Sequence, residues 1–286
     1  MKVHKKCLPC IVNQAVKFVD ATSQSDESAV LKKIFEYISR ADLEKTVTPE
    51  LVGEIFAIVT REAGNPDPYK STRDFYNNLL AEQSESLEKE IESASDPFYE
   101  AVKYAIIGNV IDFSPGYELT DRAVKEYFVR FGNEALEIDH TASLKSNVIK
   151  AKTIVYIGDN CGEIVLDKLL LKRIKALNPE AQIYFVTKGA PTLNDSVKED
   201  AYALGIQEYA TVIDHGDNCP GTVLHRTSKA FRKIFESADL VISKGQANYE
   251  SLNEADGKIY FLLMAKCSAI AQDVGTSEMK MVCMKK

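Results

Sequence analysis

The chain has 286 residues, 45% of them hydrophobic, and a formal net charge of -7 at pH 7. This length suits one large globular domain or two modest ones with a substantial core. The acidic balance argues against a duplex nucleic-acid partner, which needs a basic face to displace counterions. Because no apolar run approaches the ~20 residues of a membrane span, we predict a cytoplasmic protein without a membrane partner.

The first half of the chain has the pattern of a helical region, with apolar residues at helical spacing. Local start signals support two helices, because Thr48-Pro49 and Asp96-Pro97 each place a capping side chain before a proline. The predicted helices span residues 8–21, 26–40, 49–62, 71–93, 97–113, 119–136 and 141–150.

Beyond residue 150, short β-rich runs alternate with helical segments. This alternation is typical of parallel strands joined by right-handed crossovers. We therefore predict an α/β fold in which a helical N-terminal domain, 1–150, packs on a C-terminal domain, 151–286, with a Rossmann-like, mostly parallel sheet and flanking helices. The predicted strands span residues 153–158, 182–187, 211–214, 240–243 and 259–264.

Polar residues gather where these predicted strands end. In open α/β sheets, ligands collect beyond the carboxyl ends of the strands, where helix N-termini offer free N–H groups. For one segment alone, the turn and capping preferences of Asp and Asn explain the pattern equally well, but five segments together favour a binding site. The polar residues at the rim include Asp159, Asn160, Asp195, Asp214, His215, Lys244 and Lys266.

The residue types at this rim favour metal-assisted phosphoryl chemistry. Asp159, Asn160 and Asp195 are hard oxygen donors that suit Mg or Mn, whose open positions a phosphate can fill. Lys244 and Lys266 offer positive charge to phosphate oxygens. The sequence lacks the G-x-G-x-x-G, P-loop and G-x-S-x-G signatures, which argues against dinucleotide, P-loop and serine-hydrolase sites.

Three segments, GDNCGEIVLD at 158–167, TKGAPTLND at 187–195 and SKGQANYESL at 243–252, occur in this order, and Cys7-x-x-Cys10 precedes them. Together they resemble the damage-control phosphatase family, formerly a domain of unknown function, in its prokaryotic branch. The resemblance runs over nearly the whole chain. It implies a phosphatase that uses a divalent metal ion, Mn, Co, Ni or Mg, and hydrolyses small phosphorylated metabolites such as sugar phosphates.

The resemblance also implies residue roles. Asp159, Asn160 and Asp195 match the family's metal ligands, and Lys266 matches a lysine that neutralises charge on the phosphoryl group. The nucleophile is either a metal-bound water or Asp159 itself. Two arginines of the eukaryotic pattern are replaced here, one of them by Glu250, which implies different substrate contacts. The predicted substrate-binding residues are Asn109, Asp112, Lys244, Gln246, Asn248, Glu250 and Lys266.

Asn109 and Asp112 interrupt an otherwise apolar helix and lie three residues apart, so they share one face. Buried polar groups need partners. The pair either clamps the helical part to the sheet or belongs to a roof over the site that contacts substrate. The family resemblance favours the roof.

The cysteines leave several interpretations open. Cys7 and Cys10 lie next to a predicted helix start, which lowers a thiol pKa and favours metal binding or redox reactivity. A zinc site needs further ligands, from Cys283 or another subunit, so half-buried thiols are the simpler interpretation. Cys161 and Cys267 are predicted to be small apolar fillers near the site. The oligomeric state is left open.

Two other function classes compete with the phosphatase. One is a non-catalytic sensor that binds a metal or metabolite, with the C-x-x-C motif as a redox input. The other, ranked lower, is a carboxyl methyltransferase, because nothing in the sequence marks a site for a methyl donor. Metal-restored release of phosphate from a generic substrate separates the phosphatase from the sensor.

Overall fold

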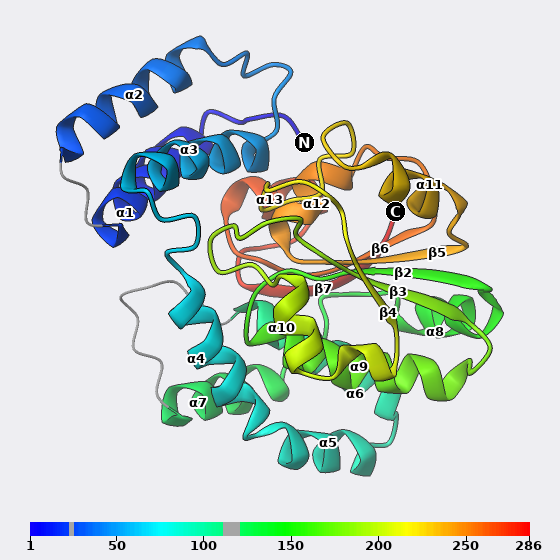
Figure 1. The fold of residues 1–286 in the computed structure, drawn as a ribbon. Helices are drawn as coiled ribbons and strands as arrows, with labels where there is room; N and C mark the ends of the chain where they lie inside the picture. Colours follow the sequence, from blue (N-terminus) through cyan, green and yellow to red (C-terminus); the bar gives the residue numbers. More distant parts are fainter. Residues whose placement is uncertain (23–25, 111–120) are drawn as a thin grey trace.

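A computed structural model describes residues 1–22, 26–110 and 121–286 (Figure 1). Within these ranges, most of the helical content precedes the sheet. The helices are α1 (Cys7–Ala21), α2 (Glu27–Arg40), α3 (Thr48–Ala63), α4 (Lys70–Ala81), α5 (Ser84–Ser93), α6 (Pro97–Val110), α7 (Asp121–Gly132), α8 (Thr141–Lys150), α9 (Glu163–Leu177), α10 (Lys198–Ala203), the 3-10 turn η1 (Ile206–Glu208), α11 (Lys229–Ser237), α12 (Gln246–Leu252) and α13 (Ser268–Val274).

The described strands form one sheet in the order β1-β7-β6-β5-β2-β3-β4. Its pairs are parallel except β6 with β7, which are antiparallel. This confirms the predicted α/β fold with a mostly parallel sheet. The strands are β1 (Ile138–Asp139), β2 (Thr153–Ile157), β3 (Gln182–Thr187), β4 (Thr211–Asp214), β5 (Leu240–Lys244), β6 (Ile259–Ala265) and β7 (Lys280–Lys285).

Side-chain alternation along the strands explains the layers on the two faces of the sheet. In β2, Ile154 and Tyr156 enter one hydrophobic core, whereas Val155 and Ile157 enter another. Successive side chains of a strand point to opposite faces, so a strand buried on both sides is apolar throughout. Figure 1 shows α11, α12 and α13 on one side of the sheet and α5, α6 and α9 on the other.

A third core joins α1, α2 and α3, which form a group beside the sheet in Figure 1. In α1, Ile11, Ala15 and Phe18 are spaced so that they share one buried face. Tyr69, just before α4, packs into this core, and Leu193 from the sheet region packs against it. The first three helices therefore touch a loop of the α/β part directly.

Helix α6 and strand β1 link the two predicted domains. Ala101, Val102, Ala105 and Ile106 are fully buried, and α6 contacts both α9 and β6. Strand β1 also precedes residue 150 and pairs with β7. The division at residue 150 stays a prediction. Within the described ranges, no helix is both long and apolar enough to cross a membrane.

Two local expectations differ from the structure, and one falls outside the described residues. The predicted helix 71–93 is two helices, α4 and α5, which both pack against α9. The hydroxyl of Ser84 donates to the carbonyl of Ala81 at the break (2.7 Å), so tertiary packing and a local hydrogen bond interrupt a helix-favouring sequence. Strands β1 and β7 were not predicted; β1 has only two residues and is defined by its pairing with β7. Asp112 lies outside the described residues.

Candidate active site

The candidate site lies at the carboxyl end of β2, at the point in the sheet where the order of the strands along the chain reverses. β2 lies between β5 and β3, so the chain continues toward β4 on one side and toward β6 on the other. Such a switch point leaves a crevice at the carboxyl ends of the strands, where ligands of open α/β sheets bind. The loop after β2, the loop after β3 and the start of α12 all begin at this edge.

Backbone contacts hold the loops after β2 and β3 against each other. Ser196 donates its N–H to the carbonyl of Asp159 (2.9 Å), and Cys161 donates to the carbonyl of Asn194 (2.8 Å). Asn160 and Asp195 form a short antiparallel bridge between the two loops. The structure thus brings Asp159, Asn160 and Asp195 together, although Asn160 and Asp195 are 35 positions apart in the chain.

Asp159 is nearly buried, and amide donors orient its carboxylate. Oδ2 accepts hydrogen bonds from Asn109 Nδ2 (3.1 Å) and Asn160 Nδ2 (3.0 Å). Gly245, at φ +79°, lies so close that a Cβ atom there would be 1.8 Å from Oδ2. Burial and nearby Glu163 raise the pKa of Asp159 to about 6, against the opposing effect of nearby lysines.

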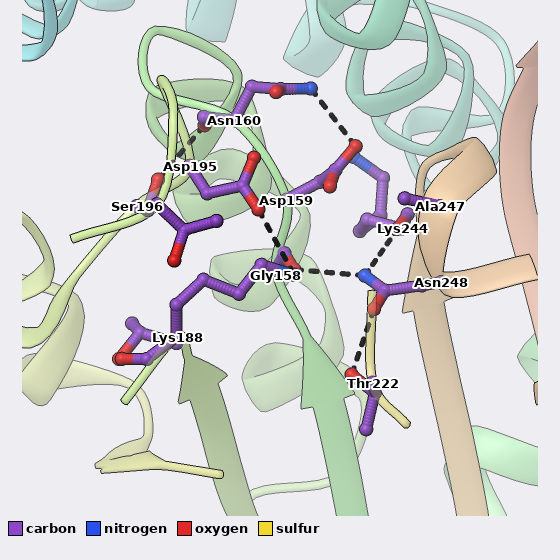
Figure 2. Close-up of polar contacts among 12 residues, drawn as sticks. Gly158, Asp159, Asn160, Lys188, Asp195, Ser196, Thr222, Lys244, Ala247 and Asn248 are labelled. Carbon is purple, nitrogen blue, oxygen red and sulfur yellow. Dashed lines mark hydrogen bonds and ion pairs between the residues drawn. The ribbon is translucent and has the colours of Figure 1, made fainter. Parts of the chain in front are cut away.

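Asp195 and Lys188 form a buried pair with unmet hydrogen-bonding capacity. Lys188 Nζ lies 3.5 Å from Asp195 Oδ2, and Figure 2 shows the lysine side chain reaching toward the carboxylate. Neither atom has a hydrogen-bond partner among the described residues. Burial raises the pKa of Asp195 well above its usual value; Lys188 opposes this rise and Asp159 adds to it. Native proteins rarely leave such atoms unpaired unless a ligand, ion or water completes them.

Asn160 lies next to Asp159 and directs its side-chain amide toward that carboxylate. Its Nδ2 donates to Asp159 Oδ2 and to Glu163 Oε2 (3.1 Å). The amide nitrogen is therefore fixed, and none of the hydrogen bonds between described residues ends on Oδ1. A carboxylate and an amide oxygen with free lone pairs next to each other are suitable ligands for a hard divalent cation.

The donor set limits the kind of metal site that the described residues can form. They contain no group of three or more His, Cys, Asp or Glu side chains arranged to hold a metal. A cation here would rest on Asp159, Asn160 and Asp195, with its other positions open. This arrangement fits Mg or Mn, which retain water molecules and bind substrate phosphate.

Behind the site, Lys244 is the centre of a buried ionic cluster that the sequence did not reveal. Its Nζ donates to Glu163 Oε1 (2.6 Å), Asp167 Oδ1 (2.6 Å) and the carbonyl of Ala105 (2.8 Å). All three N–H donors are used, and the side chain is 0% exposed. The predicted substrate-binding lysine is thus turned away from the crevice and anchors Glu163.

Glu163 connects this cluster to the predicted metal ligands. Its Oε2 accepts from Asn109 Nδ2 (3.2 Å) and from Asn160 Nδ2. Burial opposes its ionisation, but Lys244 and the two amides outweigh burial and lower the pKa of Glu163. The sequence placed Glu163 at the start of a helix, where an acid is common, so nothing marked it as part of the site.

Asn109 combines the two interpretations of the helix that carries it. Its Oδ1 accepts the N–H of Met264 in β6 (3.3 Å), which clamps α6 to the sheet. Its Nδ2 contacts Asp159 and Glu163, which places the same side chain against the site. Asn109 is 1% exposed, so its partners in the structure are protein groups.

The predicted substrate-binding stretch divides into anchoring and rim residues. Asn248 is buried and uses its amide to hold the carbonyls of Gly158 (3.1 Å) and Lys244 (2.8 Å), while Thr222 donates to its Oδ1 (Figure 2). Gln246 is half-buried and contacts the backbone N–H of Lys266 (3.2 Å). Asn248 thus anchors α12, and Gln246 is the more exposed of the two.

Glu250 and Lys266 lie on the same side of the site as Gln246. Gln246 Nε2 donates to Glu250 Oε1 (3.4 Å), while Glu250 Oε2 is buried without a partner among the described residues. Burial raises the pKa of Glu250. Lys266 is exposed, and its charge helps to lower the pKa of Asp159 against the effect of burial. Lys266 is therefore close enough to the carboxylate to influence it electrostatically.

The remaining candidate residues are His215 and the cysteines. Burial lowers the pKa of His215 to about 3, with help from Lys188, so the imidazole is neutral. All six cysteines are free thiols, and Cys161 lies in the core. Around Cys10, desolvation raises the thiol pKa, and the nearby Cys267 adds to the effect. The lowered pKa expected from a helix start is therefore wrong for Cys10.

Comparison with known proteins extends the resemblance found in the motifs. The family model described as damage-control phosphatase ARMT1-like domain matches residues 3–282. Damage-control phosphatase PH1575 of Pyrococcus horikoshii is 32% identical over 288 residues, covering 100% of this chain and 98% of the relative. A damage-control phosphatase of Archaeoglobus fulgidus is 30% identical over 290 residues, covering 99% of this chain and 98% of the relative.

The fold agrees with that of a solved relative. The crystal structure of PH1575, described as a DUF89 family protein, superposes with a TM-score of 0.92 at 30% identity, covering 100% of this chain and 99% of the other. Relatives named as phosphatases, aligned over nearly their whole length, support a phosphatase role for this chain. The chain belongs to the damage-control phosphatase ARMT1-like family.

Proposed function

We propose that this protein is a divalent-metal-dependent phosphomonoester hydrolase that acts on small phosphorylated metabolites, such as sugar phosphates, in the cytoplasm. The observation that carries the proposal is the pair of buried carboxylates, Asp159 and Asp195, on two loops joined by backbone hydrogen bonds. Like charges in a low-dielectric site raise each other's pKa. A bound cation reverses this effect, because it is the largest local charge in such a site.

Asp159, Asn160 and Asp195 are the residues that would hold the metal ion. When bound, a divalent cation supplies Lewis-acid polarisation of a phosphate oxygen. The amides of Asn109 and Asn160 fix the orientation of Asp159 through its Oδ2 atom. Prior orientation of this kind is how active sites avoid reorganisation during the reaction.

Two lysines place positive charge near the predicted ligands. The ammonium of Lys188 has no hydrogen-bond partner among the described residues and lies beside Asp195. Lys266 extends from the end of β6 and is exposed. We assign both to the phosphate group, whose charge they neutralise as the ester bond breaks.

The residues at the start of α12 favour a hydroxylated substrate. The carboxylate of Glu250 is buried next to Thr48, and Gln246 lies between it and Lys266. A carboxylate accepts hydrogen bonds from hydroxyl groups and repels a second anionic group. We therefore propose that the part of the substrate beyond the phosphate is a neutral polyol or sugar.

The test is metal add-back to protein that has been stripped with a chelator. Release of phosphate from an aryl phosphate and from a panel of sugar phosphates is measured without metal and with Mn, Co, Ni or Mg. The proposal expects activity to return with metal and to be highest on sugar phosphates. Silence on every substrate, combined with tight metal binding, would instead indicate the non-catalytic sensor.

A further inference from the structure

We propose that helix α4, together with the turn before it, positions both predicted metal-binding loops, and that Asn77 and Arg73 are positioning residues for the phosphatase reaction. We call this set of contacts the α4 clamp; it comprises Asp67, Arg73 and Asn77. The inference rests on the proposed function, because the clamp acts through Asp159, Asn160 and Asp195. It assigns an active-site role to the helical part of the chain.

The first contact of the α4 clamp holds the loop after β2. Asn77 is buried, and its Oδ1 accepts the N–H of Gly162 (2.7 Å). Gly162 precedes α9 and has a φ of +68°. The first N–H groups of a helix have no partner within the helix, so an acceptor from another element completes them. Asn77 thereby fixes the turn that carries Asp159 and Asn160.

The second contact holds the far end of the loop after β3. Arg73 is 3% exposed; its two terminal nitrogens donate to the carboxylate of Asp67 (2.8 and 2.7 Å). Its Nε donates to Asp200 Oδ2 (3.2 Å), the same oxygen that accepts the N–H of Val197 (2.9 Å). A planar guanidinium with both edges occupied is a rigid link. Asp67 and Arg73 therefore connect the turn before α4 to the residues just after Asp195.

The third observation concerns the backbone of the loop after β3, just before Asp195. Leu193, two residues before Asp195, has a φ of +50°, which costs a non-glycine residue about 1–2 kcal/mol. Its side chain packs against the core of α1, α2 and α3, which includes Tyr69. Strained residues of this kind persist only where the surroundings hold them. The helices thus also set the backbone path that leads into Asp195.

These contacts converge on the residues proposed to bind the metal. Outer contacts that orient ligands typically change metal affinity or activity about 10–100-fold when they are removed. The α4 clamp reaches both loops from one rigid helix, so it sets the distance between Asp159 and Asp195 as well as their orientation. A loss of the clamp should loosen the loops even in metal-free protein.

The sharpest test replaces Asn77 and compares it with its neighbour on the same helix. In Asn77→Leu, the N–H of Gly162 loses its acceptor while the branched outline of the side chain is kept, whereas Asn77→Asp keeps an oxygen at the same place. Asn78→Leu is the matched control, because Asn78 is exposed. Mn affinity is measured by calorimetry, turnover with an aryl phosphate, and the exchange of backbone amides 158–163 by mass spectrometry without metal.

We expect Asn77→Leu to weaken Mn affinity about tenfold or more and to speed amide exchange at 158–163. Asn77→Asp should restore most of the Mn affinity and most of the slow amide exchange. Asn78→Leu should behave like the wild type. For the second loop, Arg73→Lys keeps the charge but loses the fork, so it should speed exchange at 189–197. Its control is Asp74→Asn, which breaks only the exposed pair with Lys70.

The outcomes separate this inference from the proposed function. If folded Asn77→Leu and Arg73→Lys proteins show wild-type exchange and Mn affinity, while Asp195→Asn loses affinity, the clamp is wrong and the metal site stands. If Asp195→Asn binds Mn as the wild type does, the ligand assignment fails. Faster exchange in the metal-free clamp variants would still support the mechanical link in that case.

Discussion

Two buried polar clusters at the carboxyl end of the sheet differ in how fully their hydrogen-bonding groups are paired. In the first, Lys188 and Asp195 lie 3.5 Å apart, and the facing atoms make no hydrogen bond within the described chain. In the second, Lys244 makes three hydrogen bonds of 2.6–2.8 Å. Both lysines are almost completely buried. The difference teaches that burial alone does not identify a binding group, whereas unmet hydrogen-bonding capacity does.

The two clusters also depend on each other. Asn160 and Asn109 each donate to Asp159 on one side and to Glu163 on the other. Glu163 in turn is held by Lys244. The saturated cluster therefore serves as the rigid base that orients the unsaturated one. Substitutions in the saturated cluster should mainly lower stability, and substitutions in the unsaturated cluster should mainly lower activity.

The largest expected effect is the loss of stability in Lys244→Met. This change leaves Glu163 and Asp167 buried without their cation, and breaking a buried ion pair by removing one partner costs about 3–5 kcal/mol. The free energy of unfolding, measured with urea, should fall by that amount. Lys229→Met, at an exposed position of α11, is the control. An unchanged unfolding free energy would show that the two clusters do not differ in their contribution to stability.

Asp195→Asn should instead lower the activity without lowering the stability. We expect kcat/KM to fall about 10²–10³-fold, as for other preorganised charge-stabilising groups, because a predicted metal ligand loses its charge. The free energy of unfolding of metal-free protein should not decrease, since burial, the largest influence on Asp195, disfavours its charged form and a neutral amide avoids that cost. Activity assays across a Mn titration and urea unfolding check both parts. Near-wild-type activity at all metal concentrations would contradict the assignment.

Lys188→Met should lower activity by about 10²-fold while costing less stability than Lys244→Met. Among the described residues, Lys188 pairs with Asp195 alone, at 3.5 Å, whereas Lys244 makes three hydrogen bonds, so the loss of Lys188 leaves fewer buried groups without a partner. Paired kcat and unfolding measurements on the two lysine variants give the comparison directly. Equal stability losses would show that Lys188 is as structural as Lys244.

A pH series on Asp167→Asn tests the protonation of the saturated cluster. Burial raises the pKa of Asp167 to about 7, against the effect of Lys244. The folded protein therefore binds more protons than the unfolded chain above pH 4, and its unfolding free energy should fall as pH rises from about 4 to about 7. The variant should show a flatter profile by urea unfolding. Identical profiles would mean that Asp167 ionises normally.

The periodicity of the sequence was enough to predict most elements and the α/β class, because helix and strand patterns are local. The Asp159–Asn160 turn and Asp195 were likewise recognisable as hard ligands after strands. The gap at 82–83 between α4 and α5 was not recognisable, since the sequence there favours continued helix. Glu163 was missed because a first-turn acid has an ordinary explanation at any helix start.

The two lysines show most clearly what local sequence determines and what tertiary structure decides. Thr187-Lys188-Gly189 and Ser243-Lys244-Gly245 are nearly the same motif at the end of a strand, and only Lys244 was predicted to bind substrate. Lys244 is the last residue of β5 and shares a face with Leu240 and Ile242, where α6 and α9 supply its acceptors.

Lys188 instead follows the end of β3, beside Asp195. The sequence determined the residue types at the rim and the strands that carry them there. Only the tertiary structure decided which ammonium is saturated, because the acceptors of Lys244 lie 77–139 residues away along the chain. Partners that distant come together through packing of whole elements, which no local pattern encodes.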